Sequence, residues 1–180
     1  MPRKMIDDSI CFLIIMFDYI CMIPYTKENK HLLEDIAIKY EGPISNRSAY
    51  NFPLVYAKDY VINGKLFGIQ LTPKHEYCIS YCISHSSSND IIHEVLHALY
   101  FKDDKYRKLV KLLYESLDKR QSQRVQNYLL SLGYPTYVII DEFQAYYFTD
   151  TDFGLSKLNK MSIKNKERCI RYLNTKGIRC

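Results

Sequence analysis

The chain lacks the features that mark a secreted or membrane-spanning protein. Its six cysteines are spread over 180 residues without paired short spacings, unlike the dense cysteine frameworks of small secreted modules. No apolar run reaches the ~20 residues that span a bilayer. The best candidate for a membrane span or a signal sequence is residues 10–23. This segment is interrupted by Asp18 and is followed by no small-residue cleavage site. We expect a reduced, intracellular protein in which residues 10–23 form a buried strand or core helix, with a membrane anchor as the alternative.

An excess of positive charge is also missing from most of the chain. The net charge is +5, but residues 156–180 carry eight Lys or Arg against the single acid Glu167, a net of +7, which leaves −2 for the first 155 residues. A basic segment of this kind can contact phosphates or an anionic membrane surface, and a solvated basic helix is the alternative. The basic character therefore belongs to the C-terminal segment alone.

Residues 90–99, with the sequence DIIHEVLHAL, contain neither Gly nor Pro and include the pattern H-E-x-x-H. On a helix, His93 and His97 lie one turn apart on the same face, so both imidazoles can bind one metal ion. Glu94 is rotated away from them but can reach a water at that metal, which is the general-base position of zinc metalloproteases. The alternative is a core helix whose histidines are only hydrogen-bonded. That alternative buries two histidines and a glutamate among apolar residues, which is costly without partners.

The third metal ligand must come from another residue type, because no histidine follows His97. This excludes the pattern H-E-x-x-H-x-x-G-x-x-H, in which Asp103 would replace the last histidine. Asp103 could still bind a metal, but Tyr100 stands where that pattern needs a glycine at positive φ. Glu142 is the better candidate, because Ala145 follows it at helical spacing and would allow two helices to pack closely.

Local patterns predict the other elements. Apolar residues at helical spacing predict four further helices: about residues 28–40, 104–119, 121–132 and 162–173. Asn63-Gly64 between two apolar-rich segments predicts a β-hairpin with a type I′ turn.

In residues 76–85, large residues alternate with Cys and Ser, as is typical of a β-strand. Tyr77 and Ile79 would lie on one face and Cys78 on the other. In a strand, Cys78 and Cys82 are separated by ~13 Å, which is too far for a shared metal ion or a disulfide. If this strand lies at the edge of a sheet above the cleft, an extended peptide could pair with it.

His93-Glu94-x-x-His97, together with Glu142-x-x-Ala145 on a later helix, resembles the gluzincin clan of zinc metallopeptidases. The segment Glu142-Phe143-x-Ala145-x-x-Phe148 is similar to the third-ligand helix of lethal-factor-type and Pro-Pro endopeptidases, and to ImmA/IrrE-like peptidases. The resemblance implies one zinc ion bound by His93, His97 and Glu142, with Glu94 as the general base.

The length of 180 residues and the 47% hydrophobic content predict a single domain, residues 1–180. For this domain the resemblance implies an α+β, zincin-like fold. Residues 1–100 would form a small, twisted, mostly antiparallel sheet with a backing helix and the active-site helix. Residues 101–180 would form a helical lobe that supplies the glutamate. Thermolysin-like members carry an aspartate four residues after that glutamate, where it orients a histidine ligand. Here the position is Tyr146, so Asp141 or a main-chain carbonyl must take that role.

These observations predict a zinc metallopeptidase that acts on a protein or peptide. Lethal-factor-like enzymes place an oxyanion-stabilising tyrosine just upstream of the glutamate ligand, so the resemblance makes Tyr134 and Tyr137 the candidates for this role. The alternative is an inactive zincin-like protein that binds a protein or nucleic acid through its basic C-terminal segment. Glu94 favours the enzyme, because a binding protein has no need of that carboxylate.

Overall fold

The computed structural model describes residues 17–44, 49–82, 86–155 and 157–179. The elements are, in chain order, β1 (Ile20–Pro24), α2 (Lys30–Glu41), β2 (Ala49–Pro53), η1 (Leu54–Tyr60), β3 (Val61–Ile62), β4 (Lys65–Leu66), β5 (Ile69–Gln70), β6 (Tyr77–Tyr81), α3 (Ser88–Lys102), α4 (Asp104–Glu115), α5 (Lys119–Ser131), η2 (Thr136–Val138), α6 (Ile139–Thr149) and α7 (Lys160–Thr175). The fold is therefore α+β, as expected. Residues 10–16 of the predicted first element, and residues 83–85 of the predicted strand, lie outside the described residues.

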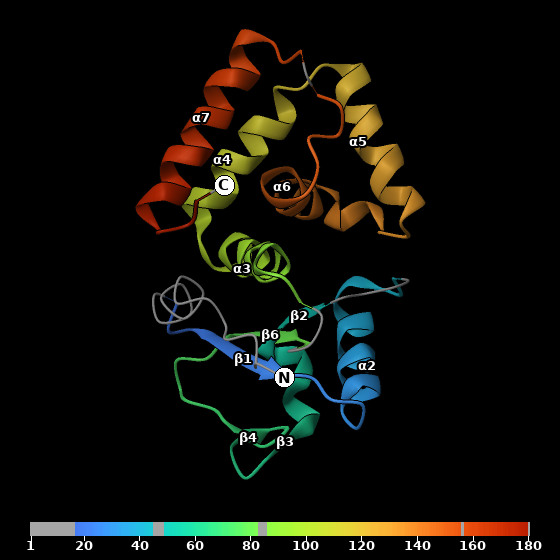
Figure 1. Cartoon of the computed structure of the whole chain (residues 1–180), viewed down its shortest axis with the longest axis vertical. Coiled ribbons are helices and arrows are strands. Elements are labelled where there is room, and N and C mark those ends of the chain that lie inside the picture. Colours follow the sequence, from blue (N-terminus) through green and yellow to red (C-terminus); the bar gives the residue numbers. More distant parts are fainter. Residues whose placement is uncertain (1–16, 45–48, 83–85, 156, 180) are drawn as a thin grey trace, which may run out of the picture.

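A mixed three-stranded sheet forms the lower part of the molecule (Figure 1). Its order is β1-β6-β2, with β6 parallel to β1 and antiparallel to β2. This sheet is mixed instead of mostly antiparallel, because the chain between β1 and β6 crosses over through α2 and β2 and returns in the original direction. A second, small sheet, β3-β4-β5, is antiparallel throughout. Residues 76–85 were a candidate for peptide pairing only if they formed an edge strand, and this condition is not met, since β6 is paired on both sides.

The two faces of β6 point into different apolar clusters, as the alternation predicted. Cys78 packs with residues of α2 such as Leu33 and Ile36. Tyr77 and Ile79 belong instead to the cluster that contains the buried face of α3. The sheet therefore lies between α2 and α3, and α3 separates it from the helical part above (Figure 1). Neither Cys78 nor Cys82 forms a disulfide within the described part of the chain.

The predicted hairpin is present between β3 and β4. Its turn residues, Asn63 and Gly64, have φ angles of 51° and 72°. Positive φ at both positions is what a type I′ turn requires, and asparagine and glycine tolerate it best.

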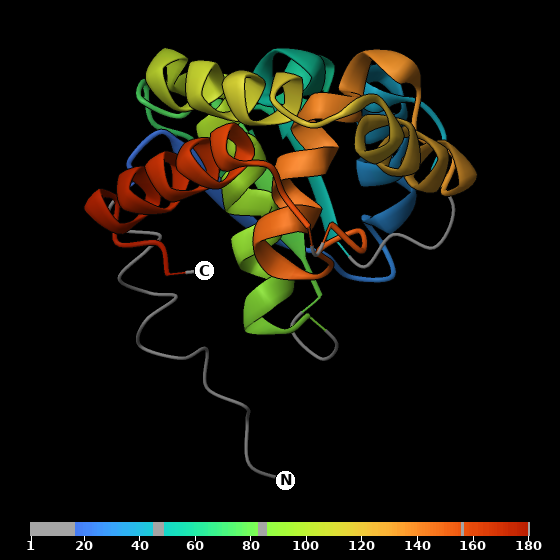
Figure 2. The same cartoon turned by 90° about the horizontal axis from the view of Figure 1, so that it is seen from above.

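The helical part consists of α4 to α7, at positions close to those predicted. In Figures 1 and 2, α6 lies against α3, and α4 lies beside α7, in agreement with the contacts between these pairs. The helix expected at residues 104–119 ends earlier, at Glu115, because Asp118 caps the start of α5. Among the helices of the described residues, none is long and apolar enough to span a bilayer.

Candidate metal centre

Helix α3 fixes the positions of both histidines from a well-defined start. Ser87 is the N-cap: its Oγ accepts a hydrogen bond from the Asp90 N–H, and the Asp90 carboxylate accepts one from the Ser87 N–H at 2.6 Å. This capping box satisfies N–H groups that would otherwise be unpaired. The helix then continues without interruption through His93 and His97, which lie one turn apart. Their ring centroids are 5.0 Å apart.

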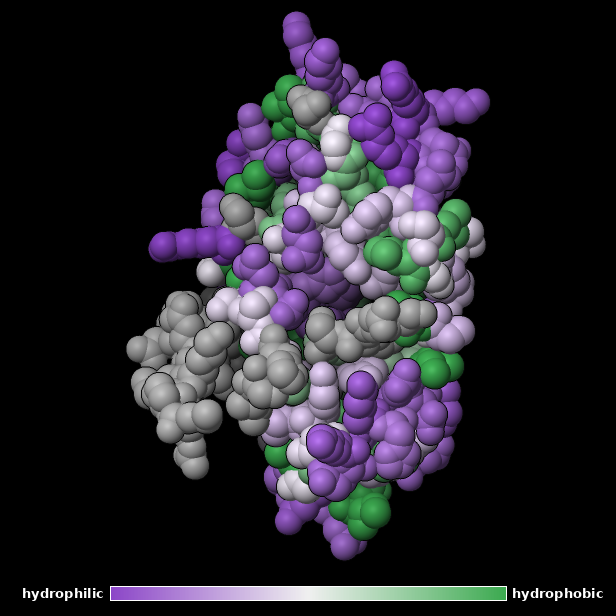
Figure 3. Space-filling model, turned by 45° about the vertical axis from the view of Figure 1, so that its right-hand side comes forward, coloured by the Kyte–Doolittle hydropathy of each residue, from purple (hydrophilic) through white to green (hydrophobic). Residues whose placement is uncertain are grey.

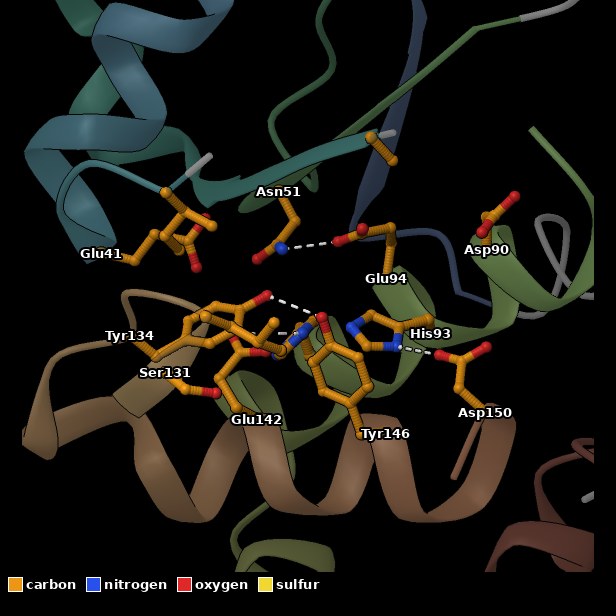
Figure 4. Close-up of a pocket in the computed structure, with 14 residues that line it drawn as sticks. Glu41, Asn51, Asp90, His93, Glu94, Ser131, Tyr134, Glu142, Tyr146 and Asp150 are labelled. Carbon is orange, nitrogen blue, oxygen red and sulfur yellow. Dashed lines mark hydrogen bonds and ion pairs between the residues drawn. The ribbon is translucent and has the colours of Figure 1, made fainter. Parts of the chain in front are cut away.

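Helix α6 brings a carboxylate to the same place. One ligand atom from each of His93, His97 and Glu142 lies within 4.8 Å of the other two, and all three residues are buried. His97 Nε2 lies 3.7 Å from Glu142 Oε1. Ala145, one turn after Glu142, is fully buried in the apolar cluster that α3 and α6 share. The structure thus brings together the three residues that the sequence predicted as ligands, of which Figure 4 labels His93 and Glu142.

Each histidine has a carboxylate on its other ring nitrogen. His97 Nδ1 lies 2.8 Å from Asp141 Oδ1, and His93 Nδ1 lies 3.2 Å from Asp150 Oδ2. A carboxylate that accepts the Nδ1 proton leaves the Nε2 lone pair available for a metal ion. Asp141 was one of the two groups expected to orient a histidine, and it lies at His97. Asp141 is held in turn by Gln144 Nε2 at 3.2 Å.

Negative charge is concentrated around the two imidazoles. Burial alone would lower the pKa of His97, but the carboxylates of Asp141 and Glu142 outweigh it and raise that pKa well above its usual value. Burial raises the pKa of Glu142, although His97 acts in the opposite direction. The hydrogen bond from His93 lowers the pKa of Asp150. Since burial excludes the water that would screen Asp141 and Glu142, the surroundings favour a cation.

A cavity of about 510 Å³ opens over the cluster. In Figure 3 it corresponds to the hydrophilic hollow between the helical part and the sheet part. Five carboxylates and the two histidines contribute to its lining, and no Lys or Arg does so among the described residues. Glu94 lies on the cavity wall opposite Glu142, with Asn51 Nδ2 donating to its Oε2 at 2.5 Å (Figure 4). The Glu94 carboxylate therefore lies beside the cluster of His93, His97 and Glu142 without being part of it.

The structure separates the other candidate residues. Tyr134 lines the cavity, and its hydroxyl lies 3.2 Å from that of Tyr146. Tyr137 is 71% exposed and does not line the cavity. Asp103, the second candidate for the third ligand, lies elsewhere: it caps α4 and accepts a hydrogen bond from the Tyr172 hydroxyl. That alternative is wrong, because the chain continues from α3 into α4 at Asp103 without turning back to the histidines.

Sequence reasoning missed three residues around the cluster. Asp150 lies eight residues after Glu142, so helical periodicity placed it on the same face and could have identified it. Asn51 is a single polar residue between Tyr50 and Phe52, which is a weak signal. Glu41 lies just beyond the helix expected at residues 28–40, but it is the buried last residue of α2 and lines the cavity.

No protein-family model, curated protein or solved structure matches this chain. The site is therefore interpreted from its own residues. Two imidazoles and one carboxylate on two adjacent helices are a donor set suited to a transition metal such as zinc. The buried Glu142 Oε2 has no hydrogen-bond partner among the residues that the structure describes, as expected of an atom placed to meet a cation.

Proposed function

We propose that this chain is a zinc-dependent metallopeptidase whose metal is held by His93, His97 and Glu142. The observation that carries the proposal is the convergence of these three side chains within 4.8 Å, beside a separate buried carboxylate in a 510 Å³ cavity. Zinc in a site of three protein ligands supplies a Lewis acid and lowers the pKa of a coordinated water towards ~7. A merely structural site would use four protein ligands, and no fourth His, Cys, Asp or Glu belongs to the cluster among the described residues.

Glu94 is the group that moves protons in this proposal. It lies next to His93 in sequence but on a different side of α3, so it faces the cavity without being a metal ligand. As a carboxylate it accepts a proton from the attacking water and then delivers that proton to the nitrogen of the leaving amine. The water oxygen bonds to the carbonyl carbon and the C–N bond breaks as the nitrogen receives this proton. The second water proton leaves the new carboxyl group, so the products are a carboxylate and a protonated amine.

Tyr134 is the group that stabilises the developing oxyanion. Burial raises its pKa, and neighbouring Glu142 adds to the effect, so the hydroxyl stays protonated at neutral pH and can donate a hydrogen bond. Burial likewise raises the pKa of Tyr146 to about 12. The Tyr146 ring packs edge-on against the His93 ring, with centroids 4.7 Å apart. It occupies the position where thermolysin-like enzymes carry an aspartate, and here Asp150 contacts His93 instead.

An extended peptide is the substrate that fits the strand next to the cavity. Because β6 is internal to the sheet, the strand available for pairing is β2, which ends the sheet and contributes Ala49 and Asn51 to the lining. Strand addition would align the scissile bond with Glu94 while leaving the side chains of the peptide to determine specificity.

Zinc stoichiometry measured together with peptide hydrolysis tests the proposal. We expect about one zinc per chain in the wild type, loss of zinc in His97→Ala and in Glu142→Ala, and retained zinc with lost proteolysis in Glu94→Ala. Matched controls are His31→Ala and Glu115→Ala, whose side chains are exposed on other helices. Full zinc occupancy in Glu142→Ala, or unchanged proteolysis in zinc-loaded Glu94→Ala, would contradict the proposal.

A further inference from the structure

The side chain of Asn51 is a buried amide on an otherwise apolar face of the sheet. It lies at the middle of β2, opposite Ile79 of β6, and is 5% exposed. Its neighbours Tyr50 and Phe52 point to the α2 side, so alternation directs Asn51 to the α3 side. An amide in such a place is costly unless both its oxygen and its nitrogen are hydrogen-bonded.

Both ends of the amide have a partner. Asn51 Oδ1 accepts a hydrogen bond from the hydroxyl of Tyr77 on β6, and Asn51 Nδ2 donates to Glu94 Oε2 at 2.5 Å. Tyr77 is fully buried, which raises its pKa far above the usual value and keeps it a neutral donor. Because a phenol hydrogen must meet an acceptor, the amide oxygen faces Tyr77 and the NH₂ group faces Glu94.

This pairing determines how Glu94 is presented to the cavity. A glutamate has three rotatable side-chain bonds, and packing on α3 alone would leave its carboxylate several orientations. With Oε2 held from the sheet, the carboxylate is connected to β2 and β6 as well as to its own helix (Figure 4). The other oxygen is then the one available to a water in the cavity.

We propose that Asn51 is a positioning residue for Glu94: its amide, oriented by the Tyr77 hydroxyl, holds one carboxylate oxygen so that the other faces the attacking water. This inference rests on the proposed function, in which Glu94 is the general base. Tyr77 acts one step further away, by keeping the Asn51 amide from rotating.

A pair of variants separates positioning from a purely structural role. Asn51→Leu removes the amide but leaves the Tyr77 hydroxyl buried without its acceptor, so we expect lower stability as well as lower activity. Adding Tyr77→Phe removes that unpaired hydroxyl, and the double variant should recover stability. We expect kcat in zinc-loaded protein to fall about 30- to 100-fold in both, with KM within about twofold of the wild type. Tyr50→Phe, on the opposite face of the same strand, is the matched control and should retain wild-type kcat.

The contact itself has a readout that needs neither zinc nor hydrolysis. In zinc-free protein, the side-chain NH₂ signals of Asn51, assigned by their absence in Asn51→Leu, should be protected from solvent exchange. This protection should be lost in Glu94→Ala and weakened in Tyr77→Phe, but retained in Tyr50→Phe.

The outcomes distinguish this inference from the proposed function. An inactive or zinc-free wild type with a protected Asn51 amide would reject the function and retain the contact. Recovery of kcat together with stability in the double variant, or a rise in KM at unchanged kcat, would overturn the positioning role. So would an Asn51 amide that exchanges freely in the wild type.

Discussion

The two histidines of the candidate centre are oriented by carboxylates in unequal surroundings. The side chain of Asp141, at 2.8 Å from His97, is 13% exposed and also accepts from Gln144. The Tyr106 hydroxyl of α4 donates a hydrogen bond to Gln144 at 2.7 Å. A series of hydrogen bonds therefore connects the Asp141 carboxylate to α4. The Asp150 side chain, at 3.2 Å from His93, is 42% exposed. Since water competes with an exposed carboxylate, His97 depends on its partner more than His93 does.

Replacing these two carboxylates should weaken zinc binding to different extents. We expect Asp141→Asn to lower zinc affinity about 10- to 100-fold, the usual effect of removing a carboxylate partner from a histidine ligand. Asp150→Asn should have a smaller effect in the same direction. Competition titration against a chelating dye measures both. Asp35→Asn, on the exposed surface of α2, is the charge-matched control. Equal losses in the two variants would show that burial of the partner is not what matters.

What the sequence could predict at this scale followed from spacing along single helices. His93 and His97 are four residues apart, and Glu142 precedes Ala145 by three, so each pair shares a helix face whatever the tertiary structure. Asn51 could not be assigned to Glu94 in this way. Their contact joins residues 43 positions apart on a strand and a helix, and only the packing of α3 on the sheet creates it.

Neighbouring residues in the sequence determine where the helices and turns begin and end. The pairing of the strands depends instead on residues that are far apart in the sequence. The turn at Asn63-Gly64 and the helix positions were predicted from neighbours in sequence. The central place of β6 depends on β1 and β2, whose partners on β6 lie 57 and 30 residues away in the register pairs Ile20–Tyr77 and Tyr50–Ser80. Its alternation therefore showed which side chains share a face and could not show whether the strand lay at an edge.

Removing the capping box should destabilise α3 measurably. Ser87→Ala removes the Oγ acceptor for the Asp90 N–H, which should cost about 1 kcal/mol in free energy of unfolding. The melting temperature should fall by about 2–4 °C for a chain of this size. Urea unfolding followed by circular dichroism measures the change. Ser88→Ala is the control, because Ser88 is exposed and is already inside the helix. A loss of the same size in both variants would mean that the cap is not responsible.

At the scale of the whole molecule, Asp103 connects three helices. It ends α3, caps α4, and accepts a hydrogen bond from Tyr172 of α7 at 2.6 Å. Lys176, just after α7, lies 3.3 Å from the same carboxylate. The basic C-terminal helix is therefore attached to the body through a carboxylate as well as through its buried apolar residues Cys169 and Leu173.

This attachment should depend on pH. Burial raises the pKa of Asp103, but the hydrogen bonds from Tyr172, the Tyr106 N–H and Lys176 outweigh it, so the pKa is lowered. A lowered pKa in the folded state contributes stability above the unfolded pKa, and this stability is lost as the pH falls through the folded value. Asp103→Asn, which keeps a good N-cap, should therefore be less stable than the wild type at pH 7. The difference should disappear at acid pH.

Chemical denaturation at a series of pH values between about 7 and 3 tests this expectation, since an unperturbed aspartate titrates near 3.9. Asp59→Asn, an exposed carboxylate in η1, should show no comparable pH-dependent difference. A difference for Asp103→Asn that persisted unchanged at the lowest pH would assign the stability to the shape of the side chain and not to its charge.

Zinc should stabilise the whole fold, because its proposed ligands come from two helices that the chain joins only through α4 and α5. An ion that binds the folded state and not the unfolded one adds about 2.7 kcal/mol at a free concentration 100 times its Kd. For a chain of this length that corresponds to a rise in melting temperature of about 5–10 °C.

We expect this rise in melting temperature with zinc in the wild type and in Glu115→Ala. Glu142→Ala should lose most of it, because α6 then contributes no ligand. Mg²⁺, which prefers oxygen ligands, should produce no comparable shift in any of the three proteins. A rise of the same size in Glu142→Ala would mean that zinc stabilises the protein through α3 alone, and the link between the two helices would be wrong.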